Sequence, residues 1–398
     1  QTYTPRLWPA LKARGVSDQQ LEALDEELKK ERFARGHTYY PAVASFGSIT
    51  SSISNRVAQV FGIKGFNMTV DGACASSFVA VDTACHALMA GDCNIALAGG
   101  ADLGVNPAIY VGFSRVDGLS TKGMANPFDH TADGLVLGEG AGVCVLKRLE
   151  DALRDGNRIR AVIRAVGSSS DGAGQAIYNP SLEGRVLALE NALDQAELEA
   201  DKVQFIEAHA TSTIVGDANE YDMISLVYGK DRDPDNLLRI GSVKGQIGHL
   251  KAAAGMAGLI KTVLAMENET LPHMPRFTKL TPGAEHPHPA IIVPTKLEKW
   301  EPRSDGKRYA GVTSSGFGGV NYHVIVEHGD TYNPPQTRPQ VSHEVAVVGM
   351  TCRVAGADTV EGFWENVKEG KDTFTRLTDH GEEVGWEDHL DAGPKEER

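Results

Sequence analysis

A cysteine lies at the first turn of a predicted helix, a position that can activate a thiol. Cys74 stands in the run DGACASS, between a predicted strand over residues 66–70 and a helix of small and apolar residues over 75–90. Unpaired backbone N–H groups and the helix dipole at such a turn favour the thiolate, and small neighbours let a substrate carbonyl approach closely. The competing interpretation is a buried cysteine that acts only as a small apolar residue. That second interpretation is the one we expect for Cys85, Cys93 and Cys144.

Two histidines and a lysine follow predicted strands further along the chain. His209, in EAHATSTIVGD, comes directly after a predicted strand over 203–207, and Lys244 and His249, in KGQIGH, follow another over 240–243. Catalytic groups of α/β proteins concentrate at such strand-to-loop junctions. A lone histidine there is more often structural. Two imidazoles, an ammonium and a cysteine at the ends of separate strands together indicate nucleophilic catalysis by a thiol.

A glycine-rich run, SSGFGGVN over residues 314–321, is a fourth candidate. It lacks the Lys-Ser/Thr of a phosphate-binding loop and the strand-to-helix context of a dinucleotide fingerprint. One interpretation is a tight turn that needs positive φ angles. The other is a loop that presents backbone N–H groups to an oxyanion, with Phe317 as a movable wall.

Strands and helices alternate along most of the chain, which predicts an α/β fold with helices on the faces of a sheet. The further predicted strands cover 94–99, 160–166, 309–314, 322–327 and 344–350, and the further helices cover 182–196, 252–267 and 362–368. The strands fall into two series, which suggests two halves, although we detect no internal sequence repeat.

In their order and separations, these four motifs resemble the β-ketoacyl synthase family. Two further runs agree with it, ADGLVLGEGAG over 132–142 and the helix start AAAG at 252–255. The resemblance covers residues 39–327. It implies a thiolase-like layered αβαβα fold of two pseudo-equivalent halves, from a multidomain synthase of the polyketide or polyunsaturated-fatty-acid type. It also implies an acyltransferase that performs decarboxylative Claisen condensation between a cysteine-bound acyl group and a malonyl group on an acyl carrier protein.

The resemblance also assigns roles to the motif residues. Cys74 would hold the acyl chain as a thioester, while His209 and His249 would donate hydrogen bonds to the malonyl thioester carbonyl. Lys244 would position His249 or stabilise charge, and Glu220 would support that network. The backbone N–H groups of Cys74 and Phe317 would form the oxyanion hole, and the Phe317 side chain would gate acyl entry.

Several residues depart from the family pattern. Ala210 and Ser212 replace the glycines of the commoner HGTGT, Gln246 stands where Asn is usual, and Ser315 takes a position often held by Phe. The reactive groups themselves are intact. We therefore expect these changes to affect acyl preference more than activity.

The order of segments is also unusual. A start typical of the family, with VAVVGM followed by Cys352-Arg353 and Phe363-Trp364, comes late in the chain. We predict a ketosynthase body over 1–328 that lacks its usual N-terminal start, a Pro-rich linker over 329–343, and the start of a second ketosynthase-like domain over 344–398. The alternative is that 344–398 is a displaced first strand and helix, supplied in cis or by a neighbouring chain.

Composition restricts the partners. A net charge of −14 argues against a nucleic-acid or anionic-membrane binder, and glycine and aspartate interrupt the apolar runs well before the roughly 20 residues of a membrane span. Five cysteines without CxxC spacing favour a reducing, cytoplasmic setting and no zinc site. We expect no cofactor and no metal, substrates carried on phosphopantetheine, an acyl carrier protein as partner, and a homodimer or a pseudodimer with a ketosynthase-like domain.

Two rival functions remain. A non-catalytic, chain-length-factor-like partner domain would usually lack the nucleophile, which is present here as Cys74. A thiolase would carry a second catalytic cysteine near the C-terminal glycine-rich loop, and that cysteine is absent.

Overall fold

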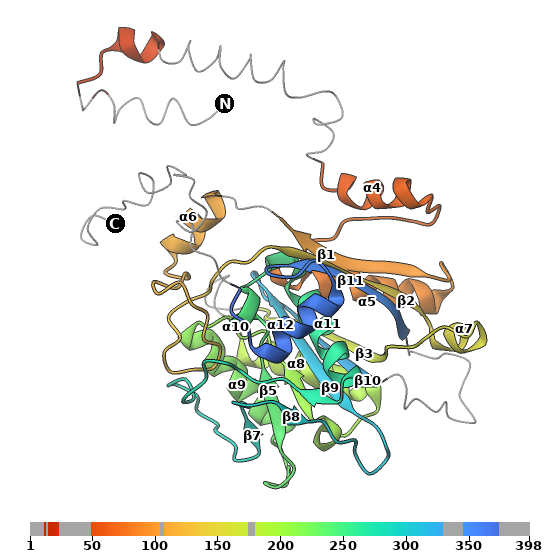
Figure 1. Ribbon diagram of the computed structural model, residues 1–398. Coiled ribbons are helices and arrows are strands. Elements are labelled where there is room, and N and C mark those ends of the chain that lie inside the picture. The colour runs from red at the N-terminus through yellow and green to blue at the C-terminus, as the bar shows by residue number, and fades with distance from the viewer. Residues whose placement is uncertain are drawn as a thin grey trace. The chain divides into compact units, whose positions relative to one another are not determined.

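The computed structural model describes residues 12, 15–23, 49–103, 107–173, 180–328 and 345–373. The chain divides into two compact units, residues 1–69 and 70–398 (Figure 1). The predicted linker over 329–343 and the charged end after residue 373 lie outside the described residues. The division of the chain at 329 and 344 therefore stays a prediction.

The described part of the first unit contains helix α4 (Ser52–Phe61), which ends at Gly62 in the left-handed conformation. Thr69 closes the unit, because its hydroxyl donates to the Thr50 carbonyl at 2.8 Å. The strand predicted over 66–70 is not formed, and both Phe66 and Met68 are half exposed. A strand needs a partner for its backbone N–H and C=O groups, and none of the described strands pairs with these residues.

Among the described residues of the second unit, nine strands form one sheet in the order β1-β2-β11-β3-β10-β9-β4-β5-β7. These strands are β1 (Ala96–Asp102), β2 (Gly140–Arg148), β3 (Ala161–Ser170), β4 (Phe205–Glu207), β5 (Leu238–Gly241), β7 (Ile291–Ile292), β9 (Tyr309–Gly316), β10 (Val320–His328) and β11 (Val345–Val354). The pairings from β1 through to β9 are antiparallel, and those from β9 through β4 and β5 to β7 are parallel.

The parallel pairing of β4 with β5 positions the predicted site. Phe205, Ile206 and Glu207 lie in register with Arg239, Ile240 and Gly241. The two strands therefore end side by side at the same edge of the sheet. The loops that carry His209 and Lys244 begin at this edge.

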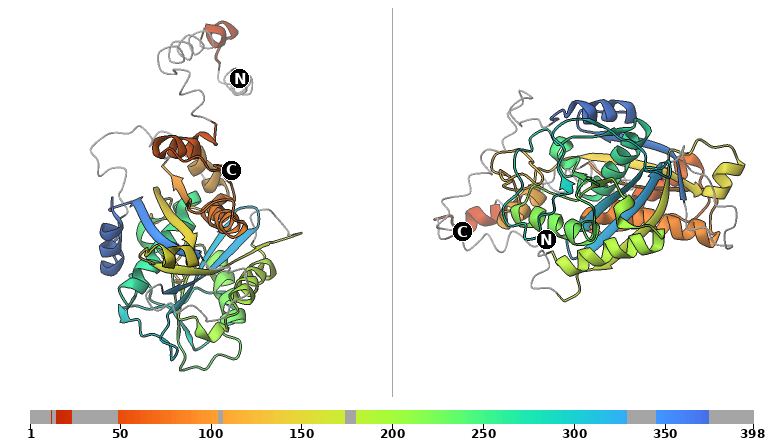
Figure 2. Two further views of the ribbon diagram at one scale, coloured as in Figure 1. Left: turned by 90° about the vertical axis from the view of Figure 1, so that its right-hand side faces the viewer. Right: turned by 90° about the horizontal axis from the view of Figure 1, so that it is seen from below.

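Two helices, α5 (Ser76–Ala90) and α11 (Ala254–Glu267), form a central layer between the two wings of the sheet (Figure 2). Every residue of α11 from 254 to 266 is buried, as expected of a helix that is covered on all sides. Gly142 on β2 faces Met256 of this helix, whereas Gly258 of the helix faces Val312 on β9. The sheet therefore contacts α11 from opposite sides.

Outer helices complete the layers. Helices α8 (Leu182–Ala196) and α9 (Ile214–Tyr228) share one apolar core with the outer face of β4 and β10. Alternation along β10 shows the two faces, because Val324 and Val326 pack toward α11 while Ile325 packs toward α8. Helix α7 (Leu149–Arg154) packs on the outer face of the other wing, with Ala346 of β11.

The late segment, residues 345–373, is part of this sheet. Its strand β11 lies between β2 and β3, with Val345 and Val347 in the central core. Helix α12 (Val360–Glu369) follows and buries Phe363 and Trp364 in the same core. The segment therefore shares one sheet and one core with the rest of the second unit. Its assignment as the start of a second domain or as a displaced first strand and helix stays a prediction.

Short elements connect these layers: α6 (Pro107–Arg115), α10 (Lys244–Ile247), the 3₁₀ turns at Ala73–Ala75, Ala200–Lys202 and Lys251–Ala253, and a two-stranded sheet of β6 (Thr270–Leu271) and β8 (Glu298–Lys299). In the described parts of the chain, one helical stretch, Ala73–Ala90, is long and apolar enough to span a membrane. It is the stretch that carries Cys74, and Phe78, Val81 and Leu88 place it in the central core of the second unit.

Candidate active site

A strained turn presents Cys74 at the start of helix α5. Ala73, just before it, has a φ of 51°, a left-handed conformation that is costly for a residue with a Cβ atom. Hydrogen bonds hold the turn: Ala73 N–H donates to the Asp71 carboxylate at 2.8 Å, and the Ser76 hydroxyl donates to the Ala73 carbonyl at 2.6 Å. The turn therefore fixes the direction in which the thiol leaves the backbone.

The glycine-rich turn between β9 and β10 lies directly against Cys74. A Cβ atom on Gly316 would lie 2.1 Å from the Gly72 carbonyl oxygen, so only glycine permits this approach. The Ser314 hydroxyl donates to the Cys74 carbonyl at 2.9 Å. Phe317 is 49% exposed, and its ring meets the edge of Phe113 with centroids 6.3 Å apart. Its predicted role as a gate stays a prediction.

The Cys74 thiol has a raised pKa. Burial of the sulfur is the largest cause, and it outweighs the positive charge of Lys244 and a hydrogen bond from the Phe317 backbone, both of which lower the pKa. The position at a helix start predicts a thiolate. In the structure, desolvation prevails, and the resting group is a thiol.

His209 leaves the end of β4 in a fixed orientation. Its ring Nδ1 accepts a hydrogen bond from the Ser315 N–H at 3.2 Å, and its own backbone N–H donates to the Glu220 carboxylate at 2.7 Å. Because Nδ1 is an acceptor, the neutral ring carries its proton on Nε2. Glu220 thus supports His209 through the main chain.

His249 has the same tautomer by an independent contact. Its Nδ1 accepts from the Lys251 N–H at 3.1 Å, so its proton also lies on Nε2. The backbone N–H of His249 donates to Val136 at 2.7 Å, within the 132–142 run noted in the sequence. The two imidazole rings lie 5.3 Å apart at 82°. The site therefore contains two neighbouring Nε2–H donors.

Both imidazoles are neutral at physiological pH. Burial lowers the pKa of His209 and of His249 well below the ordinary value of 6.5, and the charge of Lys244 lowers both further. Lys244 itself is 4% exposed, and burial lowers its pKa against the raising effect of Glu207 and Glu220. Lys244 is thus the positive charge shared by Cys74 and both histidines.

The structure brings all six predicted residues together. Lys244 interacts electrostatically with Cys74, His209 and His249. The Phe317 main chain forms a hydrogen bond with Cys74, and the Glu220 carboxylate accepts one from the His209 main chain. Their catalytic roles stay predictions. Within the described ranges, no group of three or more His, Cys, Asp or Glu residues is placed to hold a metal ion.

A buried ion pair that was not predicted from the sequence supports the start of the loop that carries Lys244. Lys261 of α11 lies 2.5 Å from Glu207, both side chains are almost fully buried, and the second Glu207 oxygen accepts from the Val243 N–H at 2.5 Å. Glu207 therefore ties the end of β4 to the residue that precedes Lys244. The signal in the sequence was a single lysine within the apolar run AGMAGLIKTVLAME.

Breaking this pair should destabilise the fold strongly. Lys261→Met leaves the Glu207 charge buried without its partner, so we expect a loss of about 3–5 kcal/mol in the free energy of unfolding, measured in urea. Lys299→Met, which breaks the exposed pair with Glu301, is the control and should cost far less, because solvent screens that pair. Equal losses in the two variants would show that Glu207 does not depend on Lys261.

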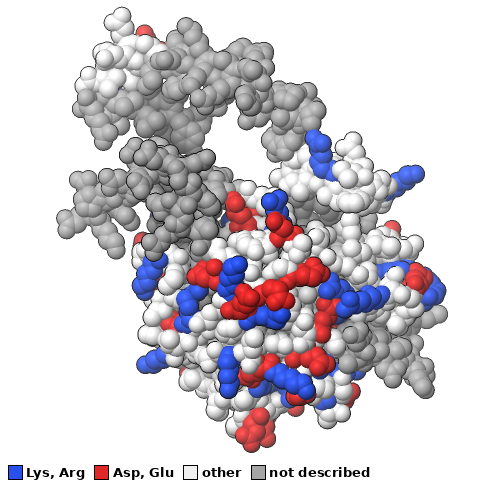
Figure 3. Space-filling view, in the orientation of Figure 1, with Lys and Arg blue, Asp and Glu red and all other residues white. Residues whose placement is uncertain are grey.

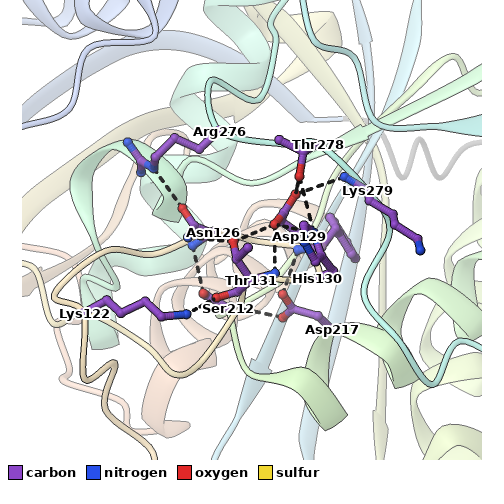
Figure 4. A network of polar contacts seen from close by, with 11 residues as sticks. Lys122, Asn126, Asp129, His130, Thr131, Ser212, Asp217, Arg276, Thr278 and Lys279 are labelled. Atoms are coloured by element: carbon purple, nitrogen blue, oxygen red, sulfur yellow. Dashed lines mark hydrogen bonds and ion pairs between the residues drawn. The ribbon is translucent and has the colours of Figure 1, made fainter.

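Asp217 and Ser212 form a second support for the loop after His209 (Figure 4). In the sequence, Ser212 was noted only as a departure from the family pattern, and Asp217 was given no role. The Asp217 carboxylate accepts from the N–H groups of Thr211, Ser212 and Phe128 at 2.9, 3.1 and 2.8 Å. Burial nevertheless raises the pKa of Asp217 to about 7, with a contribution from Glu220. This carboxyl group holds the loop after His209 to the start of α9. The sequence feature that could have indicated this role is an acidic residue in the first turn of a helix, where its charge is favoured.

Ser212 stands where the family commonly has glycine, and its φ of 66° shows why. Its hydroxyl accepts from the buried Asn126 N–H at 2.8 Å, which offsets part of the strain. Ser212→Ala leaves that N–H unpaired and keeps the strain, whereas Ser212→Gly loses the bond but relieves the strain. We expect the Ala variant to be less stable than the Gly variant by about 1 kcal/mol in urea unfolding. A more stable Ala variant would contradict this account.

Comparison with known proteins agrees with this geometry. The family model for the N-terminal domain of β-ketoacyl synthase matches residues 13–152 and 342–396, and the model for the C-terminal domain matches residues 160–278. The chain belongs to the β-ketoacyl synthase family. The N-terminal model matches on both sides of the C-terminal one, and the second match contains β11 and α12.

Relatives place the chain among polyketide synthases. It is 40% identical over 325 residues to a phenolphthiocerol/phthiocerol polyketide synthase protein of Mycobacterium tuberculosis, covering 79% of this chain and 17% of that protein. It is 42% identical over 281 residues to the polyketide synthase GfsA of Streptomyces halstedii, covering 71% and 4%. The chain thus spans a small part of the length of these relatives. Ketosynthase domains of such synthases are acyl-transferring enzymes.

Solved ketosynthases share the fold. The oxazolomycin ketosynthase domain of Streptomyces albus superposes with a TM-score of 0.68 at 33% identity, covering 73% of this chain and 51% of that one. The ketosynthase from module 6 of the bacillaene synthase of Bacillus subtilis gives 0.69 at 26% identity, covering 88% and 68%. The predicted thiolase-like αβαβα fold is confirmed.

Proposed function

We propose that this ketosynthase condenses an acyl group held on Cys74 with a malonyl unit, with loss of CO₂. The observation that carries the proposal is the pair of neutral imidazoles, His209 and His249, which both present an Nε2–H beside one another. Two fixed, uncharged donors suit a developing enolate oxygen. A general base would need a free nitrogen acceptor, and here both Nδ1 atoms are occupied.

The first step loads the enzyme. The Cys74 sulfur attacks an acyl thioester, a new carbon–sulfur bond forms, and the carrier thiol leaves with the proton that Cys74 gives up. Lys244 and the Phe317 N–H stabilise the transient thiolate, because both favour the charged form of the sulfur. The thioester carbonyl then lies at a helix start, where the backbone N–H groups of Cys74 and Phe317 supply the oxyanion hole.

The second step uses the histidines. The malonyl carbon–carbon bond breaks and CO₂ leaves. The electron pair of the broken bond moves into an enolate, whose oxygen accepts hydrogen bonds from both Nε2–H groups. One good donor of this kind contributes about 3–4 kcal/mol in a site with little water. The enolate carbon then attacks the Cys74 thioester, a carbon–carbon bond forms, and the Cys74 sulfur leaves as thiolate. The thiolate takes up one proton from solvent, which restores the resting thiol. Atoms and charge balance without an added oxidant or metal.

The proposed partners follow from the chemistry and from the relatives. Substrates would arrive on the phosphopantetheine arm of an acyl carrier protein, in the cytoplasm, and the chain would act as a dimer or a pseudodimer with a ketosynthase-like domain. Acidic and basic side chains are interspersed on the face seen in Figure 3, without an extended field of one sign. A pathway in polyketide or polyunsaturated-fatty-acid synthesis is part of the same proposal.

One assay tests the reaction. The full chain is incubated with a labelled acyl pantetheine thioester and with malonyl pantetheine, and CO₂ and the β-ketoacyl product are both measured. We expect equal amounts of the two. Product without CO₂ would indicate a thiolase reaction, and neither product nor acyl labelling of the protein would indicate a non-catalytic partner domain.

A further inference from the structure

Gln246 lies at the centre of the loop that carries Lys244 and His249, and it is bonded to the late segment 345–373. Its side-chain amide donates to the carbonyls of Asn366 and Val367 at 3.4 and 3.2 Å, in the last turn of α12. Its backbone carbonyl accepts from Thr373 twice, from the N–H at 3.2 Å and from the hydroxyl at 2.9 Å. Gln246 itself is 2% exposed. Four hydrogen bonds thus join one residue of the catalytic loop to the segment.

A neighbouring ion pair strengthens the same junction. Arg276 lies 2.9 Å from Asp372 of the segment, and its guanidinium also donates to the backbone carbonyl of Gly245 in the loop. On its other side Arg276 donates to the Asn126 side chain at 2.9 Å, as Figure 4 shows. The two residues that follow Lys244 are therefore both connected to the end of the segment. Gln246 is connected directly, and Gly245 is connected through Arg276.

The loop is short and closed, so a shift at Gln246 is transmitted to its neighbours. Helix α10 is a single turn, in which Gln246 N–H donates to Val243 at 2.8 Å and Gly248 N–H donates to Lys244 at 3.1 Å. Lys244 lies two residues before Gln246 and His249 three residues after it. The segment is anchored by Phe363 and Val367 in the central core, to which Ile247 of the loop also belongs. Helix α12 therefore contacts the loop from a fixed position in that core.

We propose that Gln246 is a positioning residue, through which the segment 345–373 holds the loop of Lys244 and His249 in place beside Cys74. The family more commonly has asparagine at this position. A side chain shorter by one methylene would lose about 1.5 Å of reach. The contacts at 3.2 and 3.4 Å would then open beyond hydrogen-bonding distance. The longer side chain accounts for the departure at residue 246.

The significance of this positioning rests on the proposed function, but its test does not require condensation. The charge of Lys244 favours the Cys74 thiolate, so displacement of Lys244 changes the pH at which the thiol reacts. Iodoacetamide alkylates the thiolate. The alkylation rate of the Cys74 peptide, followed by mass spectrometry in the intact full chain across a pH series, therefore reports the position of Lys244.

Gln246→Ala and Gln246→Asn should both move the alkylation profile of Cys74 to higher pH. At a fixed pH below the midpoint, we expect alkylation to be about three- to tenfold slower than in the wild type. The matched control is Asn366→Ala. It removes an amide-to-carbonyl bond of 2.8 Å that lies wholly within the segment, to Gly356, and leaves the loop contacts in place. We expect it to lower the unfolding midpoint but not to move the alkylation profile.

A double variant shows whether the effect passes through Lys244. Lys244→Met should raise the alkylation midpoint by itself, and adding Gln246→Ala should change it no further. An unshifted profile in Gln246→Ala, a shift to lower pH, or an equal shift in Asn366→Ala would each overturn the inference. If the chain does not condense acyl groups but these profiles shift as expected, the positioning role stands and only the proposed reaction fails.

Discussion

Cys74→Ala should lose acyl labelling and condensation by about a thousandfold or more, because no other described thiol can take the acyl group in this site. Cys85 and Cys144 are buried in apolar surroundings that raise the pKa of the first above its ordinary range and of the second to about 12. Alanine fits the turn, since residues 73 and 75 are already alanines. The change therefore removes the sulfur and leaves the turn intact.

The same position separates loading from decarboxylation. Cys74→Gln should also abolish labelling, but it should retain CO₂ release from malonyl pantetheine, because the histidines are held by Ser315 and Lys251 and not by Cys74. Labelling is read by mass spectrometry of the Cys74 peptide, and CO₂ by its release over time. The control is Cys93→Ala, which removes another part-buried thiol and should leave both readings unchanged. Unchanged acyl labelling in Cys74→Ala would remove Cys74 from the mechanism.

The sequence contained enough to predict the local elements of the site. The strand before His209 is predicted at 203–207 and found at 205–207, and the helix predicted at 182–196 is found with those bounds. These elements have strong local signals, because each buries one continuous apolar stretch or one face. Helix α9 was missed. Asp217, Glu220 and Asp222 are buried within it, so its polar residues do not mark a solvent face.

Contacts between distant segments could not be predicted from the sequence. Strand β11 pairs with β2, some two hundred residues earlier, and nothing in VAVVGM specifies that partner. The Glu207–Lys261 pair, the hydrogen bond from Asn126 to Ser212 and the Gln246 junction are likewise contacts between separate elements. The motif residues were predictable because each has a distinctive side chain after a strand. Their supports are ordinary residues whose importance depends on what the fold places beside them.

The protonation state of Cys74 could not be predicted from the sequence either. A helix start favours a thiolate in general, but the sequence does not reveal how completely the protein covers the sulfur. In the structure, burial raises the thiol pKa more than Lys244 and the Phe317 backbone lower it. In the proposed mechanism, a thiol that ionises only while it reacts would be protected from oxidation and adventitious alkylation between turnovers. Lys244 would then matter most during acyl transfer, when the sulfur carries charge.

Replacing either histidine should remove most of the decarboxylation. His249→Leu takes away one of two Nε2–H donors, so we expect CO₂ release to fall by about 10²–10³. His209→Leu should give a similar loss. In His249→Gln the side-chain amide is also neutral and donates near the position of Nε2, so this variant should retain more CO₂ release than His249→Leu. Acyl labelling of Cys74 serves as the control and should persist in His249→Leu.

The pH dependence tests the same donors in the unmodified protein. Burial keeps both imidazoles neutral well below pH 6.5, the ordinary titration point of histidine. CO₂ release at pH 6 should therefore stay within about twofold of that at pH 7.5, whereas an ordinary histidine would already be mostly protonated. Half-loss near pH 6.5 would contradict this, and so would an equal fall in CO₂ release for His249→Leu and His249→Gln.

Protonation of the buried histidines at low pH should lower the free energy of unfolding as well as the activity. The folded pKa of each buried imidazole lies below the unfolded value, so the unfolded chain binds more protons as the pH falls below 6.5. His323, bonded to Tyr228 and Thr313, acts in the same direction, because burial lowers its pKa to about 3. Each such histidine should lower the free energy of unfolding by about 1.4 kcal/mol per pH unit in that window. Urea unfolding at pH 7.5 and pH 5.5 should show this loss, and it should be smaller in His249→Leu, where one of these groups is absent.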